Sequence, residues 1–242
     1  MRGALLAVGV VGVAALIIVA NASRGDGAPI AVPDRVTASF RATPQDGTTA
    51  TYTGVVHKVP APEGAALPWQ VSAQVSFTRE DGSVQTVTVL DNRAYFHLAR
   101  GTSDGEGAPG DIIGAGCVPE QDVPPYNEFK DALEAAVALP ADAQLADYAT
   151  GACADAGAVS YTVAWAGQVY VFCELGDDAS IRQFVGEGFV ADIFDVVVAE
   201  DVADAAPFAA PTDADGAPLD CPVISGLAHA ASGVAETRRR LE

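Results

Sequence analysis

Alternating apolar and polar positions dominate the first hundred residues of this chain. The clearest case is Trp69–Thr78, in which every second residue is apolar and the residues between are polar. Such alternation is typical of a strand with one buried and one solvated face in an antiparallel sheet. Asp81-Gly82 is a strong hairpin signal after it. The same pattern predicts an antiparallel sheet of about five strands, the other four being Val36–Ala42, Thr49–Val59, Val84–Leu90 and Arg93–Ala99.

The second half of the chain mixes helical and strand patterns. Apolar residues at helical spacing predict a helix that Pro124-Pro125 opens and Pro140 ends, and Ala141–Ala149 predicts a second short helix. Val159–Trp165 and Gln168–Glu174 predict the two strands of a β-hairpin. This hairpin is the densest aromatic region outside the first half of the chain.

Helical spacing returns after the hairpin. Asp178 is placed to cap a helix that Gly186 interrupts, and its apolar positions are Ile181, Phe184 and Val185. Phe189–Ala199 is compatible with a continued helix or with a strand, because β-branched residues are frequent in it. Asp201–Pro218 is predicted to be a surface linker, and Ile224–Ala235 a last helix.

These patterns predict an α+β fold. An N-terminal antiparallel β-meander is followed by a disulfide-stapled helix–β-hairpin–helix unit, and an apolar signal or anchor helix precedes both. The expected segments are a signal peptide or membrane anchor (1–22), a spacer (23–33), a sheet domain (34–100), a loop (101–116), and an α+β domain (117–242) that contains the hairpin region 151–190.

The N-terminal segment predicts export. Residues 4–20 are an unbroken apolar run between Arg2 and the small-residue site Ala20-Asn21-Ala22, which is the pattern of a secretory signal peptide. The run is almost as long as the roughly 20 residues that span a bilayer, so an uncleaved anchor is the alternative. We therefore expect a periplasmic or secreted protein, in contact with the inner membrane only through residues 4–20 if these are retained.

The charge of the chain excludes one class of partner. The formal net charge is −19, and Lys58 and Lys130 are the only lysines. Nucleic acid is not expected as a partner, because phosphate binding by counterion release needs many cationic contacts. The acidity is most simply a solubility feature of an exported surface.

The four cysteines are an even number in an exported chain, and two disulfides are expected. The sequence alone leaves their connectivity open. We favour Cys153–Cys173, which would close a loop within the hairpin region, and Cys117–Cys221, which would link the segments before and after that region. Loop closure gives each such bond about 3–4 kcal/mol of stabilisation.

The hairpin region resembles the YHS/TRASH group of small metal-associated modules. These modules carry a Cys, then a G-x-x-Y-x-F-C hairpin strand, then a further Cys and a Phe. The matching positions here are Cys153, Gly167, Tyr170, Phe172, Cys173 and Phe184. The resemblance covers residues 151–190 only, and Asp177 replaces the third metal-binding Cys.

What the resemblance implies is a metal site formed by Cys153, Cys173 and Asp177. Thiolates suit Cu(I) or Zn, and a carboxylate in place of a thiolate favours Zn. The competing interpretation is that Cys153 and Cys173 form a disulfide in an oxidising compartment and that the protein has no cofactor. We favour the disulfide.

Other candidate catalytic residues form no recognisable motif. His57 and His97 fall within predicted strands and His229 within the last predicted helix. No G-x-S-x-G nucleophile motif is present, since Ile224-Ser225-Gly226 has only its last half.

Acidic and aromatic clusters have simpler explanations. Asp213-Ala214-Asp215-Gly216 has part of a calcium-loop pattern but lacks the closing Glu, which favours a linker. Acidic residues alternate with valines near residue 195 and are expected on a solvent-exposed face: Asp192, Asp195, Glu200 and Asp201. The aromatic residues of the first sheet are expected in its core, or lining an apolar pocket if the sheet curves: Trp69, Phe77, Tyr95 and Phe96.

Taken together, the sequence predicts an exported, non-catalytic envelope protein that binds a partner protein or a small ligand. A YHS/TRASH-like envelope module binding Cu or Zn is the first alternative. A hydrolase without a recognisable motif is the second.

Overall fold

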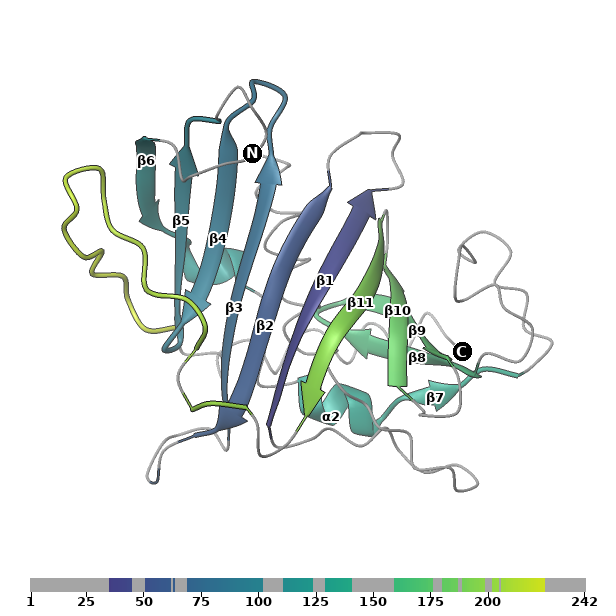
Figure 1. Ribbon diagram of the computed structural model, residues 1–242. Coiled ribbons are helices and arrows are strands. Elements are labelled where there is room, and N and C mark those ends of the chain that lie inside the picture. Colours follow the sequence, from purple (N-terminus) through teal and green to yellow (C-terminus); the bar gives the residue numbers. More distant parts are fainter. Residues whose placement is uncertain are drawn as a thin grey trace.

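The computed structural model consists mainly of antiparallel β-strands (Figure 1). It describes residues 35–44, 51–61, 63, 69–101, 111–123, 129–140, 159–175, 180–186, 189–198, 202–204 and 206–224. The strands are β1 (Val36–Pro44), β2 (Tyr52–Pro60), β3 (Trp69–Thr78), β4 (Val84–Leu90), β5 (Arg93–Ala99), β6 (Ile112–Cys117), β7 (Val137–Ala138), β8 (Val159–Trp165), β9 (Gln168–Leu175), β10 (Ser180–Gly186) and β11 (Phe189–Val198). The helical elements among these residues are η1 (Glu120–Asp122) and α2 (Phe129–Glu134).

All eleven described strands belong to one sheet, in the order β6-β5-β4-β3-β2-β1-β11-β10-β9-β8-β7. The chain therefore starts at the middle of the sheet and runs outward to β6. It resumes at the opposite edge with β7 and returns to the middle. There β11 pairs with β1, in a register that places Phe40 opposite Ile193 and Ala42 opposite Ala191. The sheet is continuous across the regions 34–100 and 117–242.

The five predicted strands of the first half are confirmed, but the predicted α+β fold is wrong. The region expected to form a helix–β-hairpin–helix unit contributes five strands to the sheet. β10 occupies the segment that was expected to be helical after Asp178, and the undecided segment Phe189–Ala199 is the strand β11. The helix expected to end at Pro140 is shorter, since α2 ends at Glu134 and Val137–Ala138 is already a strand.

The predicted helix was wrong because β10 is apolar on both faces. Phe184 packs in the core on one face of the sheet, and Val185 is buried on the other. Adjacent apolar residues such as these fit a helical stripe as well as a strand buried on both sides. Cross-strand pairing with β9 and β11 decides between the two, and it is not visible in the local sequence.

The predicted loop 101–116 also contains a strand that sequence analysis missed. Ile112–Cys117 is the edge strand β6, paired with β5. Its glycines, Gly114 and Gly116, lie opposite Leu98 and Phe96. Glycine lowers strand propensity, so the pattern gave no indication of a strand.

One face of the sheet carries the hydrophobic core, and we call it the inner face. Its buried side chains come from both halves of the chain, and Val118, Val123 and Leu133 of α2 join the same cluster. Representative members from β1 to β11 are Phe40, Val56, Val75, Val87, Phe172, Phe184 and Ile193. The opposite face, which we call the outer face, carries the alternate residues of each strand.

Aromatic rings lie over glycines on the inner face. Phe40 is the cross-strand partner of Gly54, Phe96 of Gly116, and Phe189 of Gly186. In each pair, a Cβ added to the glycine would lie 3.0 Å or less from the ring. Glycines covered by a neighbouring aromatic ring allow a sheet to bend. The bend can be followed in Figure 1: β3 to β5 run vertically in this view, whereas β8 and β9 run across it, behind β11.

After β11 the chain continues without regular strands or helices in the described residues. We call residues 202–204 and 206–224 the strap, because they follow β11 in the chain and reach the turn between β4 and β5 (Figure 1). The segments expected to be an N-terminal apolar helix, a second short helix (141–149) and a last helix from residue 225 onward lie outside the described residues. Within the described part, no helix has the length and hydropathy needed to cross a membrane.

Candidate functional site

The inner face is the first candidate site, because it forms an apolar surface that is continuous across the bent sheet. Phe172 and Phe184 stack with ring centroids 5.9 Å apart, and Phe189 meets Phe184 edge-on at 5.5 Å. In the other half of the sheet, on the same face, the Tyr52 and Phe77 ring centroids are 4.9 Å apart. Aromatic pairs in tilted or edge-on contact contribute both apolar area and a fixed geometry.

Small residues lie between these aromatic groups. Ala42 and Ala191 face each other where β1 pairs with β11, and both are fully buried. Gly54 and Ala73 continue the small-residue surface on β2 and β3. The described covering elements are short: Leu133 of the six-residue α2 and the pair Val118 and Val123 pack onto the same core.

Of the predicted aromatic core residues, two lie on this face. Phe77 is buried in the core and Phe96 packs against it. Tyr95 is buried but faces the outer side, because it alternates with Ala94 and Phe96 along β5. The side chain of Trp69 lies outside the described part of the structure.

Lys58 is a charged residue of this otherwise apolar face. It lies opposite Val36 on β1 and Val71 on β3, and only 5% of its surface is exposed. The ammonium has an interaction partner within the protein. A buried ammonium is tolerated only when it is paired or hydrogen-bonded, so Lys58 marks a polar position at one end of the inner face.

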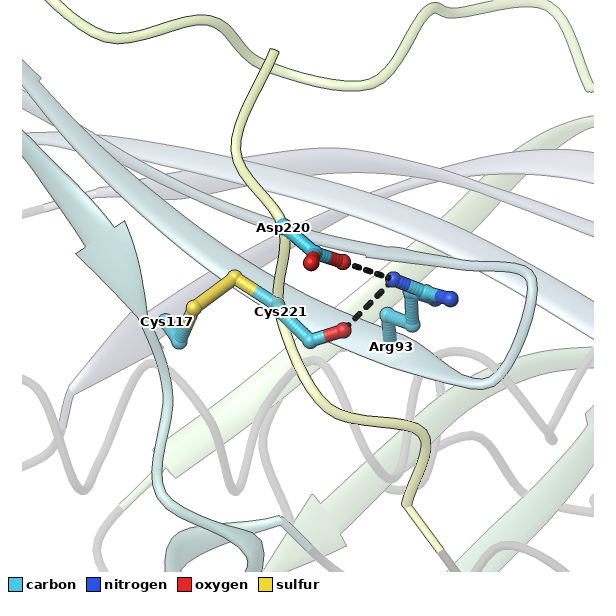
Figure 2. Close-up of a disulfide and its surroundings, with 4 residues drawn as sticks. All are labelled: Arg93, Cys117, Asp220 and Cys221. Carbon is cyan, nitrogen blue, oxygen red and sulfur yellow. Dashed lines mark hydrogen bonds and ion pairs between the residues drawn. A yellow bond between two sulfur atoms is a disulfide. The ribbon is translucent and has the colours of Figure 1, made fainter.

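The second candidate region is the far end of the strap, which is covalently attached to the sheet. Cys221 forms a disulfide with Cys117 at the end of β6, which is the pairing that the sequence favoured. Figure 2 shows Arg93 beside it: Nη1 donates to the Cys221 carbonyl at 2.7 Å and pairs with Asp220 at 3.0 Å. The Ile224 amide donates to the Asn92 carbonyl at 2.7 Å. The disulfide and these bonds fix the strap at the turn between β4 and β5.

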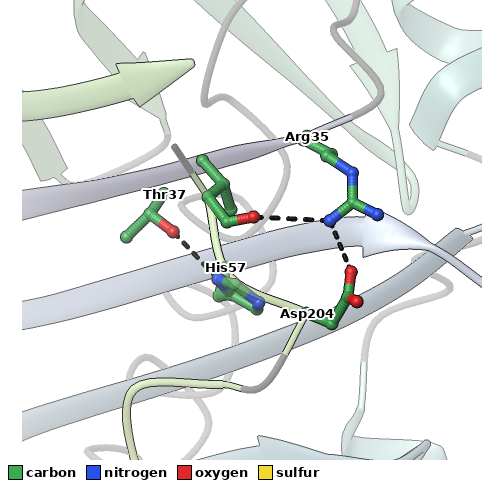
Figure 3. Close-up of polar contacts among 5 residues, drawn as sticks. Arg35, Thr37, His57 and Asp204 are labelled. Atoms are coloured by element: carbon green, nitrogen blue, oxygen red, sulfur yellow. Dashed lines mark hydrogen bonds and ion pairs between the residues drawn. The ribbon is translucent and has the colours of Figure 1, made fainter. Parts of the chain in front are cut away.

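The third candidate region is the point where the strap first meets the outer face, at His57 (Figure 3). Thr37 Oγ1 and His57 Nδ1 are 2.8 Å apart across the β1–β2 ladder. Arg35 donates to the Val202 carbonyl at 3.3 Å and forms an ion pair with Asp204. His57 is 3% exposed, and its Nε2 has no hydrogen-bond partner in the described part of the chain.

This environment favours the neutral imidazole. Burial is the main cause that lowers the pKa of His57 from its ordinary value, and the Arg35 guanidinium lowers the pKa further. The backbone and the carboxylate of Asp204 act in the opposite direction, but they do not cancel the effect of burial. An imidazolium at this position would lack water and would lie near a second cation.

The other two histidines do not belong to this region: one lies on β5 and the other lies outside the described residues. His97 lies on β5 opposite Thr86 and Ala115, and burial lowers its pKa. Its Nδ1 also has no hydrogen-bond partner among the described residues. His229 and the Ser225-Gly226 fragment lie outside them. Thr37 Oγ1 lies within hydrogen-bond distance of His57 Nδ1, but Nε2 of His57 has no hydrogen-bond partner among the described residues that would orient the ring as the third member of a catalytic triad.

Of the three predicted metal ligands, the described part of the structure includes Cys173. Cys173 is disulfide-bonded and buried beside Ser160, whose hydroxyl donates to its sulfur at 3.5 Å. Its expected partner Cys153 and the carboxylate of Asp177 lie outside the described residues. A sulfur in a disulfide is not a thiolate ligand. Within the described ranges, no group of three His, Cys, Asp or Glu residues is placed to hold a metal ion.

The acidic candidates take structural roles where they are described. The Asp213 carboxylate accepts bonds from the amides of Asp215 and Ala217, which closes a tight turn in the strap. Asp192 accepts a bond from the Gln183 amide at 2.8 Å on the outer face. Asp195 lies at an irregularity of β11 with φ of 51°. Glu200 and Asp201 lie outside the described residues.

A comparison of this chain with protein-family models and with curated protein sequences found no match. The class of protein is therefore given by its architecture: a bent, eleven-stranded antiparallel sheet with an apolar inner face and a disulfide-anchored strap. The resemblance of residues 151–190 to the YHS/TRASH modules stays a prediction.

Sequence analysis missed Arg35, Thr37 and Asp204, which surround His57. It also missed the small residues Ala42 and Ala191, which face each other where β1 pairs with β11. Nothing in the local sequence singles out these residues. Asp204 lies in a segment that is rich in Ala, Pro and Asp and was expected to be a linker. The alternation of β2 places His57 on the opposite side from Tyr52 and Val56, but Val55 and Val59 share the side of His57, so the pattern does not mark that side as solvated.

Proposed function

We propose that this protein is an exported, non-catalytic envelope protein that binds a small apolar ligand on the inner face of its sheet. The observation that carries the proposal is the continuous cluster of buried apolar side chains on the inner face of the bent eleven-stranded sheet. Ligand sites are lined mainly by hydrophobic and aromatic side chains, and the inner face has this composition.

The covering elements support the same proposal. The described cover of the inner face consists of a six-residue helix and a short segment around η1. Short elements with few anchoring contacts open at low free-energy cost. A ligand can therefore reach the inner face by displacement of this cover while the sheet itself stays intact. The apolar N-terminal run and the even number of cysteines support a location in the cell envelope.

The experiment combines ligand recovery with one inner-face substitution. Wild-type protein is purified without detergent, extracted with organic solvent for mass spectrometry, and titrated with an uncharged naphthylamine probe. Ala191→Leu adds bulk at the fully buried Ala42–Ala191 pair, and Ala164→Leu adds the same bulk at an exposed outer-face position of β8.

Ala191→Leu is expected to weaken probe binding about tenfold or more, because the added side chain takes ligand space. Its free energy of unfolding should stay within about 1 kcal/mol of wild type, whereas overpacking of a solid core costs about 1–3 kcal/mol. Ala164→Leu should bind the probe as wild type does. The proposal is wrong if the wild type carries no apolar compound and binds no probe.

A further inference from the structure

The strap is held to the sheet by two attachments of different chemistry. At the far end the attachment is the disulfide Cys117–Cys221, which Arg93 reinforces (Figure 2). At the near end it is non-covalent: Arg35 holds Val202 and Asp204, and the backbone of Asp204 lies against the buried ring of His57 (Figure 3). Only the near end can detach without a covalent change.

The near end of the strap closes over His57. Val202 is 5% exposed although it lies in an irregular segment, and His57 is 3% exposed on the outer face. Thr37 on β1 and Ser72 on β3 are the cross-strand neighbours of His57, and Ser72 is buried as well. The outer face is thus covered where the strap begins.

The groups around His57 make this closure sensitive to its charge. The charged groups that face it are Arg35, which precedes β1, and Asp204 in the strap. The described neighbours on β1 and β3, Thr37 and Ser72, do not titrate near neutral pH. Burial, with Arg35 adding to it, lowers the pKa of His57 and outweighs the backbone and carboxylate of Asp204, which favour a charged ring. Nε2 has no described hydrogen-bond partner in the closed arrangement. An unsatisfied buried donor that carries a charge costs more than a neutral one.

We propose that His57 is a pH-sensitive latch for the strap. With a neutral imidazole the start of the strap lies against β2, and protonation of His57 releases this near end while the Cys117–Cys221 disulfide keeps the far end attached. The released imidazolium gains water, and the strap stays attached at its far end through the disulfide, Arg93 and the Ile224–Asn92 hydrogen bond. The downward direction of the His57 pKa agrees with this coupling. The latch does not depend on ligand binding to the inner face.

Hydrogen–deuterium exchange of the full chain, with its disulfides intact, tests the latch at about pH 5 and about pH 7.5. Rates are corrected for the intrinsic pH dependence of exchange. Peptides covering residues 202–212 should lose protection at the lower pH by a factor of up to about 30, the limit set at pH 5 by an ordinary imidazole pKa of about 6.5. Peptides from β3 and β4 should keep their protection.

Two variants assign the effect to one histidine. His57→Gln is neutral at both pH values, so residues 202–212 should show no pH-dependent change. His97→Gln is the matched control on β5 and should keep the wild-type response. The latch is wrong if the wild-type strap is equally protected at both pH values, if His57→Gln keeps the response, or if β3 and β4 lose protection together with the strap.

A measurement on the wild type covers the case in which His57→Gln does not fold. The imidazole signals of isotope-labelled histidine are followed by NMR against pH, with His97→Gln used for assignment. The midpoint of the His57 titration should coincide with the midpoint of strap release. Two midpoints that differ by more than the experimental error contradict the latch.

Discussion

The ring of Phe40 lies against Gly54, its partner across the β1–β2 ladder. A Cβ built on Gly54 would lie 2.6 Å from that ring and 2.5 Å from the backbone oxygen of Gln74. Side chains of ordinary residues do not fit at such distances, and the Gln74 backbone cannot rotate away as a side chain can. The middle of the sheet therefore depends on the absence of a side chain at position 54.

Gly54→Ala is expected to lower the free energy of unfolding by about 1–3 kcal/mol, the usual cost of overpacking. Gly114→Ala is the matched control on the same face, because a Cβ there would meet only the Leu98 Cβ, at 3.9 Å. It should be neutral or slightly stabilising, since alanine reduces the freedom of the unfolded chain. Urea denaturation of both variants checks this, and equal losses would contradict the close approach.

The first five strands could be predicted because each presents a polar side to the outer face. Gln70, Ser72, Gln74 and Ser76 alternate with core residues in β3, and a period of two has no helical explanation there. In β10 and β11 the outer face is partly apolar as well, because Val185 lies opposite Val190 and opposite Val171 of β9. Apolar residues on both faces weaken the alternation, so β10 was predicted as a helix and β11 was left undecided, whereas β9 was predicted as a strand.

The candidate site could be predicted only in part, because its partners are distant in sequence. The alternation of β2 puts His57 on the outer side, yet its environment depends on Asp204, which is 169 residues from its ion-pair partner Arg35. The bend of the sheet likewise requires aromatic residues on one strand to meet glycines on the next, as Phe189 meets Gly186. Local pattern carries no information on such pairs.

Stability should decrease as the pH falls below about 6.5, the ordinary pKa of histidine. Burial lowers the pKa of both His57 and His97 in the folded protein. Between the lowered values and about 6.5 the unfolded chain binds more protons than the folded one, so the free energy of unfolding rises with pH in that window. The stabilisation that comes from the two neutral histidines is therefore complete above about pH 6.5 and is lost as the pH falls through this window.

Urea midpoints between about pH 5 and pH 8 measure this dependence. The double variant His57→Gln, His97→Gln should show a flatter profile over this range, even if it is less stable overall. Carboxylate titration lies lower: the hydrogen bonds from Ser83 lower the pKa of Asp81, for example, so it stays charged throughout this range. A profile as steep in the double variant as in the wild type would assign the pH dependence to other groups.

All four cysteines are expected to be oxidised, in two disulfides. Cys117–Cys221 is one of them, and Cys173 is bonded in another. Alkylation of the denatured protein followed by intact-mass measurement should therefore add no label before reduction and four labels after it. Metal analysis of the same sample tests the alternative prediction: two reactive thiols at Cys153 and Cys173, together with bound zinc or copper, would establish the metal-binding interpretation instead.

Removal of the Cys117–Cys221 bond should be the most destabilising single change at the strap. The bond closes a loop with a sequence separation of 104 residues, for which loop entropy predicts about 4–5 kcal/mol. The double variant Cys117→Ser, Cys221→Ser is expected to lose roughly this amount in denaturant unfolding. Arg93→Met removes the pairing with Asp220 and the bond to the Cys221 carbonyl but keeps the disulfide. Because that ion pair is exposed, its loss should cost about 1 kcal/mol or less. If the two variants were equally stable, the strap would be held by packing, and the disulfide would not be its anchor.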